Sequence, residues 1–172
     1  MRGAVSKSSE TSKAIDENIE LKLRWGTFCK GVALEPGTNE TTVIGILPAL
    51  KIAAQVFAGS NEKLPIYLPI PLWLHVSFSY KNSTSEPIKT NVEMTLSIHE
   101  KIHTEILPVT VGPSETSYIL NLRINTPNGI PLQPGPQSLK ALFTHKGKTL
   151  GEIELPVTVD IINIKSTQEV KP

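Results

Sequence analysis

The residues best suited to chemistry are grouped in one pentapeptide, His99-Glu100-Lys101-Ile102-His103. It satisfies H-E-x-x-H, the pattern in which paired histidines bind zinc and the glutamate activates a water molecule. That chemistry needs a helix, because four helical residues rise only about 6 Å and both imidazoles then share one face. Both rings can then reach one ion at about 2.1 Å. The pentapeptide therefore makes a zinc-dependent hydrolase one hypothesis, with His99 and His103 as ligands and Glu100 as base.

The neighbouring residues favour an extended pentapeptide over a helical one. Apolar and polar residues alternate from Val92 to Ile98, and a second strand-like run begins at Thr104. This pattern predicts a hairpin with its turn near His99 to Lys101. In an extended chain, residues four apart are separated by about 13 Å, which is too far to chelate one ion.

A helical pentapeptide stays an alternative, because Ile98, Ile102 and Ile106 are spaced i, i+4. Val92 and Met94 do not join that stripe, however, and a proline at position 108 would end the helix early. We therefore predict no metal ligand and keep the zinc hydrolase as the alternative reading.

Other catalytic and cofactor patterns are missing from the sequence. The chain has Asp only at positions 16 and 160 and contains no G-x-S-x-G elbow, so a serine hydrolase triad is disfavoured. It also has no phosphate-cradling G-x-x-x-x-G-K-[ST] or G-x-G-x-x-G loop. We predict a protein that is not an enzyme, with no catalytic residue and no cofactor.

The composition favours strands. Val, Ile and Thr total 45 residues, whereas Ala numbers 8, and β-branched side chains suit pleated, half-buried surfaces. Four stretches alternate clearly between apolar and polar residues and are predicted strands: 72–80, 92–98, 118–124 and 153–159. Four further candidates are less regular: 21–34, 42–52, 104–111 and 139–144, the last joined to the strand near Ile153 by a hairpin through His145 to Lys148.

These elements predict an all-β, antiparallel β-sandwich of about seven or eight strands, because no helices alternate with them. The sandwich is expected to span 19–164. Polar residues fill 1–18 and 165–172, so we expect a disordered N-terminal tail and a loose C-terminal tail. Asn125 to Pro136 is expected to be a surface turn. The sequence leaves two alternatives for Ile46 to Ala58: a helical turn after the strand, or an apolar patch that faces a partner.

Charge and cysteine content bound the partners and the compartment. Lys and Arg number 17 and Asp and Glu 16, so no excess of positive charge points to nucleic acid. No stretch has the roughly 20 apolar residues of a membrane span, and residues 1–20 lack the apolar core of a signal peptide. A lone Cys29 is typical of a reducing compartment. We predict a cytoplasmic protein without a membrane span.

The chain from Trp25 to Val159, about four-fifths of its length, resembles a prokaryotic immunoglobulin-like β-sandwich family of unknown function. The matching stretches are WGTFCKGVALEP, TTVIGILPALKI, LPIYLPIPLWLHVSF and IPLQPGPQSLKALFTHKGKTLGEIELPVTV. The resemblance implies the immunoglobulin-like fold. It implies no catalytic or ligand residue, because none is established for that family.

The function predicted from the sequence is therefore a non-enzymatic interaction or structural module that acts through a sheet edge or a loop surface. An unpaired strand edge offers main-chain donors and acceptors to a partner, which is another protein or a second copy. A small-molecule-binding β-sandwich is a further alternative, and fluorescence quenching of Trp25 or Trp73 would reveal its ligand.

Overall fold

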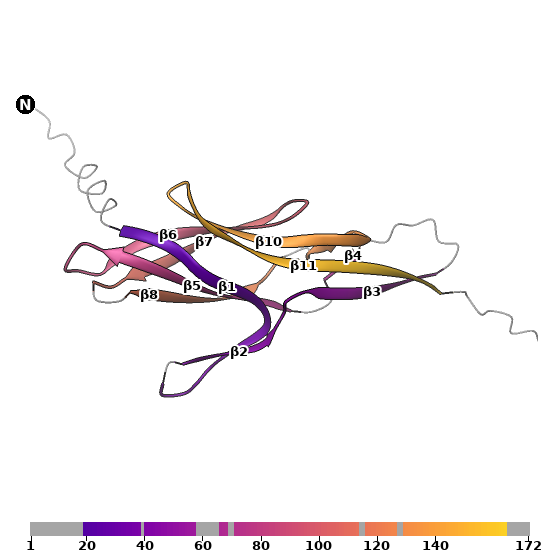
Figure 1. Cartoon of the computed structure of the whole chain (residues 1–172), viewed down its shortest axis with the longest axis horizontal. Helices are drawn as coiled ribbons and strands as arrows, with labels where there is room; N and C mark the ends of the chain where they lie inside the picture. Colours follow the sequence, from indigo (N-terminus) through magenta and orange to yellow (C-terminus); the bar gives the residue numbers. More distant parts are fainter. Residues whose placement is uncertain are drawn as a thin grey trace, which may run out of the picture.

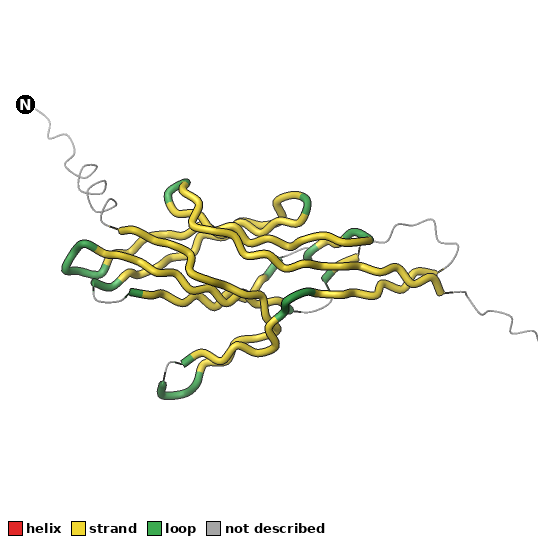
Figure 2. Tube along the Cα trace, in the orientation of Figure 1, coloured by secondary structure: helices red, strands yellow, loops and turns green. Residues whose placement is uncertain are grey.

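The computed structural model describes residues 19–38, 40–57, 66–68, 71–113, 116–126 and 129–164. These ranges contain eleven strands and no helix, which confirms the all-β prediction (Figure 2). No helix able to cross a membrane exists in this part of the chain. Both expected tails, 1–18 and 165–172, lie outside the described residues.

Nine of the strands form two large sheets (Figure 1). The first is antiparallel, in the order β2 (Thr41–Ile46), β1 (Ile19–Leu34), β5 (Leu72–Asn82) and β8 (Ser117–Ile124). The second has the order β3 (Leu50–Phe57), β11 (Lys148–Ile164), β10 (Gly135–His145), β6 (Ile88–Ile98) and β7 (Glu100–Val111). β4 (Ile66–Tyr67) and β9 (Pro131–Leu132) form a small third sheet.

The inward faces of the two large sheets share one buried core. Along β6, the side chains of Val92, Met94, Leu96 and Ile98 are at most 3% exposed, as their alternation predicts. The same is true of Leu155, Val157 and Val159 on β11, whereas the alternating residues of β8 are only half-buried. All of these buried side chains belong to a single cluster that draws on both sheets. Apolar periodicity therefore identified the core face of the long strands.

The predicted hairpin between β10 and β11 is confirmed. Lys146 and Gly147 form its two-residue turn, and both have positive φ angles, 53° and 75°. That geometry matches the twist of the flanking strands and favours glycine at the second position.

Four expectations about the connections need correction. The single strand expected over 42–52 is two strands in different sheets, because Pro48 cannot donate to a ladder and the chain changes sheet there. β3 then pairs with β11 in parallel, so the second sheet is mixed and not purely antiparallel. The expected surface turn at 125–136 contains β9 and the buried side chains of Ile130 and Leu132. Over 50–57 the chain is strand, not a helical turn, and Ala58 lies outside the described residues.

One part of the first sheet stands apart from the core. β1 pairs with β5 from Ile19 to Cys29 and with β2 from Cys29 to Leu34, so the two pairings overlap only at Cys29. Residues 29–38 and 40–46, which we call the arm, thus contain a two-stranded ribbon, and Figures 1 and 2 show it projecting from the body of the molecule. The amide of Leu47 donates to the carbonyl of Phe28 at 2.9 Å and ties the end of β2 back to β1.

Candidate functional site

The H-E-x-x-H pentapeptide lies at a strand reversal, as the hairpin prediction states. β6 ends at Ile98 and β7 begins at Glu100, with His99 alone between them. His99 has a φ of 59°, a left-handed conformation that residues other than glycine rarely adopt. The pentapeptide is therefore a turn residue followed by four residues of strand, and the helical alternative is wrong.

The second histidine of the motif, His103, lies on a strand and not in the turn. His103 lies on β7 opposite Leu96, and its Nε2 is 4.0 Å from the Oε2 of Glu105. Among the described residues, no group of three His, Cys, Asp or Glu side chains is placed to hold a metal ion. The structure thus does not assemble the ligand set that the zinc chemistry requires.

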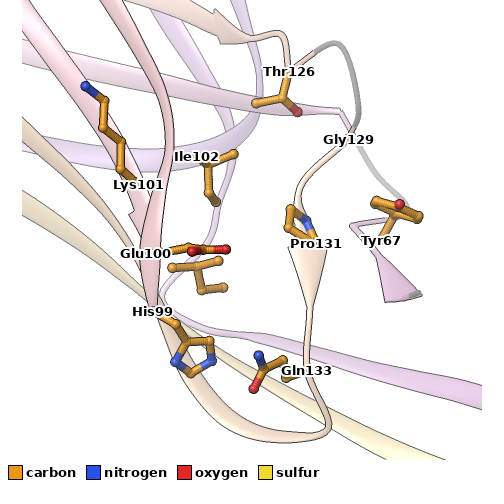
Figure 3. Close-up of a pocket in the computed structure, with 10 residues that line it drawn as sticks. Tyr67, His99, Glu100, Lys101, Ile102, Thr126, Gly129, Pro131 and Gln133 are labelled. Carbon is orange, nitrogen blue, oxygen red and sulfur yellow. The ribbon is translucent and has the colours of Figure 1, made fainter. Parts of the chain in front are cut away.

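The turn instead lines a surface pocket of about 660 Å³ (Figure 3). His99, Glu100 and Lys101 form one wall, and Tyr67 from β4 and Gln133 just after β9 contribute from the opposite side. The pocket therefore places an imidazole, a carboxylate, a carboxamide and a phenol around one volume, groups that suit a small polar ligand.

Two local features position the Tyr67 side of this pocket. Gly129 has a φ of 70°, and its amide donates to the carbonyl of Thr126 at 3.0 Å. A Cβ at Gly129 would lie 3.0 Å from Cδ1 of Tyr67, so the missing side chain makes room for the ring. Tyr67 is 46% exposed, so part of this side chain is accessible to a ligand.

The sheet edges are the second kind of candidate site. The two large sheets end in four edge strands, β2, β8, β3 and β7. Exposed edges normally carry charges or proline, which discourage pairing with another chain. β7 contains Pro108 and several charged residues, β8 contains Arg123, and β3 contains Lys51. β2, with the sequence TTVIGI, has neither a charged residue nor a proline.

The arm around β2 also exposes large apolar side chains. Leu34 is 68% exposed, Ile44 is 51% exposed and Ile46 is 60% exposed. β1 occupies only one edge of β2, so the other edge of this strand is a terminal edge of the sheet. The arm therefore combines an unblocked strand edge with apolar surface.

Trp25 and Trp73, the two fluorescence probes named above, lie on β1 and β5 of the four-stranded sheet. The Trp25 ring packs against the His75 ring with 4.9 Å between their centroids and 45° between the ring planes, and the His75 Nδ1 hydrogen-bonds the Asn121 Oδ1. His75 alternates along β5 with the core residues Leu74 and Val76, so this cluster is on the outer face of the sheet. Trp25 is 49% exposed there.

Cys29 is buried and is a free thiol. Burial raises the pKa of this thiol, and a backbone hydrogen bond at Gly31 opposes the rise only in part. The neutral thiol is therefore the form that the fold favours, which makes Cys29 a poor nucleophile.

Comparisons with known proteins give no functional assignment. No protein-family model matches the chain, and no curated protein matches it. Among solved structures it is similar to a putative β-galactosidase from Bacteroides fragilis, with 17% identity, a TM-score of 0.31 and 55% of this chain covered. It is also similar to a β-glucosidase from Listeria innocua in complex with glucose, with 12% identity, a TM-score of 0.38 and 84% of this chain covered. The matches span only 15% and 16% of those two chains, respectively.

Proposed function

We propose that the chain is a cytoplasmic, non-enzymatic interaction module with an immunoglobulin-like β-sandwich, and that a partner adds a strand to the free edge of β2. The resemblance to the prokaryotic immunoglobulin-like family supports the fold in this proposal. The buried free thiol of Cys29 agrees with a reducing compartment.

One observation carries the proposal: of the four edge strands that the described residues give the two large sheets, β2 is the one that lacks both charge and proline. A strand edge presents a row of main-chain donors and acceptors, and a partner strand gains affinity by pairing with them. The β-branched residues of TTVIGI favour an extended backbone, so little ordering is needed before pairing. The exposed side chains of Ile44 and Ile46 then supply specificity through cross-strand contacts.

A paired set of lysine substitutions tests the proposal. Ile44→Lys places a charge on the free edge strand β2, and Ile106→Lys places one on the edge strand β7, where Ile106 is 65% exposed. Tagged wild type and both variants are used to capture proteins from an extract of the source organism. We expect wild type and Ile106→Lys to retain the same partner, which is another protein or a second copy of this chain. Ile44→Lys should lose that partner. The proposal is contradicted if Ile44→Lys retains the partner as well as wild type does, or if wild type retains no partner.

A second candidate function rests on the pocket at the β6–β7 turn. The left-handed backbone of His99 is a strained conformation, and strain of this kind gathers at ligand sites. In this reading the pocket binds a small polar molecule between Tyr67 and Glu100. A metabolite library screened by thermal shift tests it: a hit must be lost in Tyr67→Ala and kept in Ile119→Ala, a change at an exposed position outside the pocket.

A further inference from the structure

We infer that the strand added to β2 is β2 of a second copy of this chain, in an antiparallel pairing about a two-fold axis. This inference rests on the proposed function and names the partner for the same edge. Pairing β2 with its own copy would join two arms into a four-stranded sheet. The inference is carried by the distribution of charge along the arm.

The base of the arm is positive. Lys30 is exposed, and its side chain extends over Gly45, so that a Cβ at Gly45 would lie 3.1 Å from the Lys30 Cδ. The stem of Lys30 therefore packs over Gly45 of β2, and Lys30 is the one charged residue at the base of the arm.

The tip of the arm is negative. Glu35 and Glu40 are both exposed, and the amide of Glu35 donates to the carbonyl of Glu40 at 2.9 Å, which closes the turn. The Thr42 hydroxyl donates to Glu35 Oε1 at 3.1 Å and holds that carboxylate beside the start of β2. The loop from Glu35 to Glu40, EPGTNE, contains no lysine or arginine to offset these charges.

An antiparallel two-fold pairing matches these charges. When β2 runs beside a copy of itself in the opposite direction, the base of each arm lies next to the tip of the other. Lys30 of one copy then faces the end that carries Glu35 and Glu40 of the other. Because β2 has no charge of its own, nothing repels its copy along the shared edge.

The second copy also resolves an energetic difficulty of the isolated arm. A two-stranded ribbon is only marginally stable in water, whereas sheets of more strands with a shared apolar surface are stable. Pairing gives β2 a ladder on its second edge and places cross-strand neighbours beside Ile44 and Ile46.

Charge reversal at the two ends tests the inference with the full-length chain. Sedimentation velocity over increasing protein concentration measures self-association of wild type, Lys30→Glu and the double variant Glu35→Lys/Glu40→Lys. We expect a dimer for wild type and dissociation constants about tenfold higher or more for each variant alone. An equal mixture of the two variants should restore the dimer, because each variant end then meets an opposite charge. Lys89→Glu, a reversal at an exposed position of β6 away from the arm, should leave the dimer unchanged.

The outcomes separate the inference from the proposed function. The second copy is not the partner if the wild-type chain stays monomeric. The same conclusion follows if the dimer forms equally well in both charge-reversal variants. If the capture experiment still shows loss of a partner in Ile44→Lys, strand addition at β2 stands with a different occupant. If capture is also indifferent to Ile44→Lys, the proposed function fails as well.

Discussion

The ring of Phe78 on β5 meets the ring of Phe143 on β10 edge to face, with 5.4 Å between the ring centroids and 77° between the ring planes. The two residues belong to different sheets, and both are at most 1% exposed. Aromatic rings attract one another in this geometry because the positive edge of one faces the negative face of the other. The contact therefore ties the inner faces of the two sheets together.

Phe143→Ala should destabilise the protein by about 3 to 5 kcal/mol, because it removes a fully buried ring and leaves a cavity. Urea unfolding followed by circular dichroism measures the free energy of unfolding. In a double-mutant cycle with Phe78→Ala, the coupling energy should be about 0.5 to 1.5 kcal/mol. Ile119→Ala, at a position that is 48% exposed, serves as the control and should change stability by no more than about 0.5 kcal/mol. Strict additivity of the two phenylalanine changes would contradict the edge-to-face contact.

The sequence predicted those parts of the fold that depend on local periodicity. The core faces of β5, β6 and β11 were visible because alternate residues are apolar. The outer face of β5 was not: His75 and Ser77 occupy polar positions and are still buried, and the Trp25 ring of the neighbouring strand packs against His75. The parallel pairing of β3 with β11 is likewise a long-range choice of partner that no local pattern encodes.

Close packing of β1 against β11 depends on Gly151. A Cβ at this position would lie 2.9 Å from the Leu23 Cβ and 2.5 Å from its Cδ2. Gly151→Ala should therefore cost about 1 to 3 kcal/mol of unfolding free energy, measured by urea denaturation. Leu23→Ala in the same chain removes the Cδ2 and Cγ contacts but keeps the Cβ at 2.9 Å, so it relieves only part of the clash. The double variant should still be more stable than the sum of the two single effects.

Gly31→Ala is the matched control for that experiment. Its Cβ would meet only the Ile44 Cβ, at 3.9 Å, which is an ordinary contact, and its φ is not in the left-handed region. The variant should be neutral or slightly more stable than wild type, because alanine restricts the unfolded chain. Equal losses at the two glycines would show that backbone freedom, and not the approach of Leu23, explains the effect at Gly151.

The candidate pocket was predictable only in part. The pentapeptide drew attention to His99 and Glu100, although for a chemistry that their extended geometry does not support. Tyr67 and Gln133 gave no signal, because they come from separate segments that β4 and β9 bring beside the turn. The sequence TTVIGI shows that β2 has no charged residue, but it does not show that β2 lies at the edge of a sheet.

Zinc should bind the protein no more tightly than it binds exposed histidines in general. His99 is a turn residue and His103 lies on β7 with Glu105 beside it, so the helical face that chelates zinc is not formed. After equilibration with zinc and gel filtration, mass spectrometry of the metal content should find well under one ion per chain. Adding zinc should leave the thermal midpoint of wild type, of His99→Ala and of His103→Ala unchanged. Stoichiometric zinc that disappears in His99→Ala would revive the hydrolase hypothesis.

The buried thiol of Cys29 should make stability depend on alkaline pH. Its pKa is raised in the folded protein because burial disfavours the thiolate. The unfolded chain then loses the thiol proton first, starting near a pH of about 8.5. The contribution is complete below the unfolded pKa and is lost as pH rises toward the folded pKa. Between about pH 8 and about pH 10, the wild type should lose more unfolding free energy than Cys29→Ala does. All other titrating groups are the same in the two proteins, so the difference between them reports the titration of Cys29 alone.

Thiol reactivity provides an independent check of the same burial. A disulfide reagent such as DTNB should react with Cys29 slowly in the native protein and quickly in denaturant, because only the accessible thiolate attacks. If the native thiol reacts as fast as the denatured one, Cys29 is accessible through local opening of the sheet where β1 passes from β5 to β2. In that case the pH dependence of wild type and Cys29→Ala should coincide, since the folded and unfolded thiols would share one pKa.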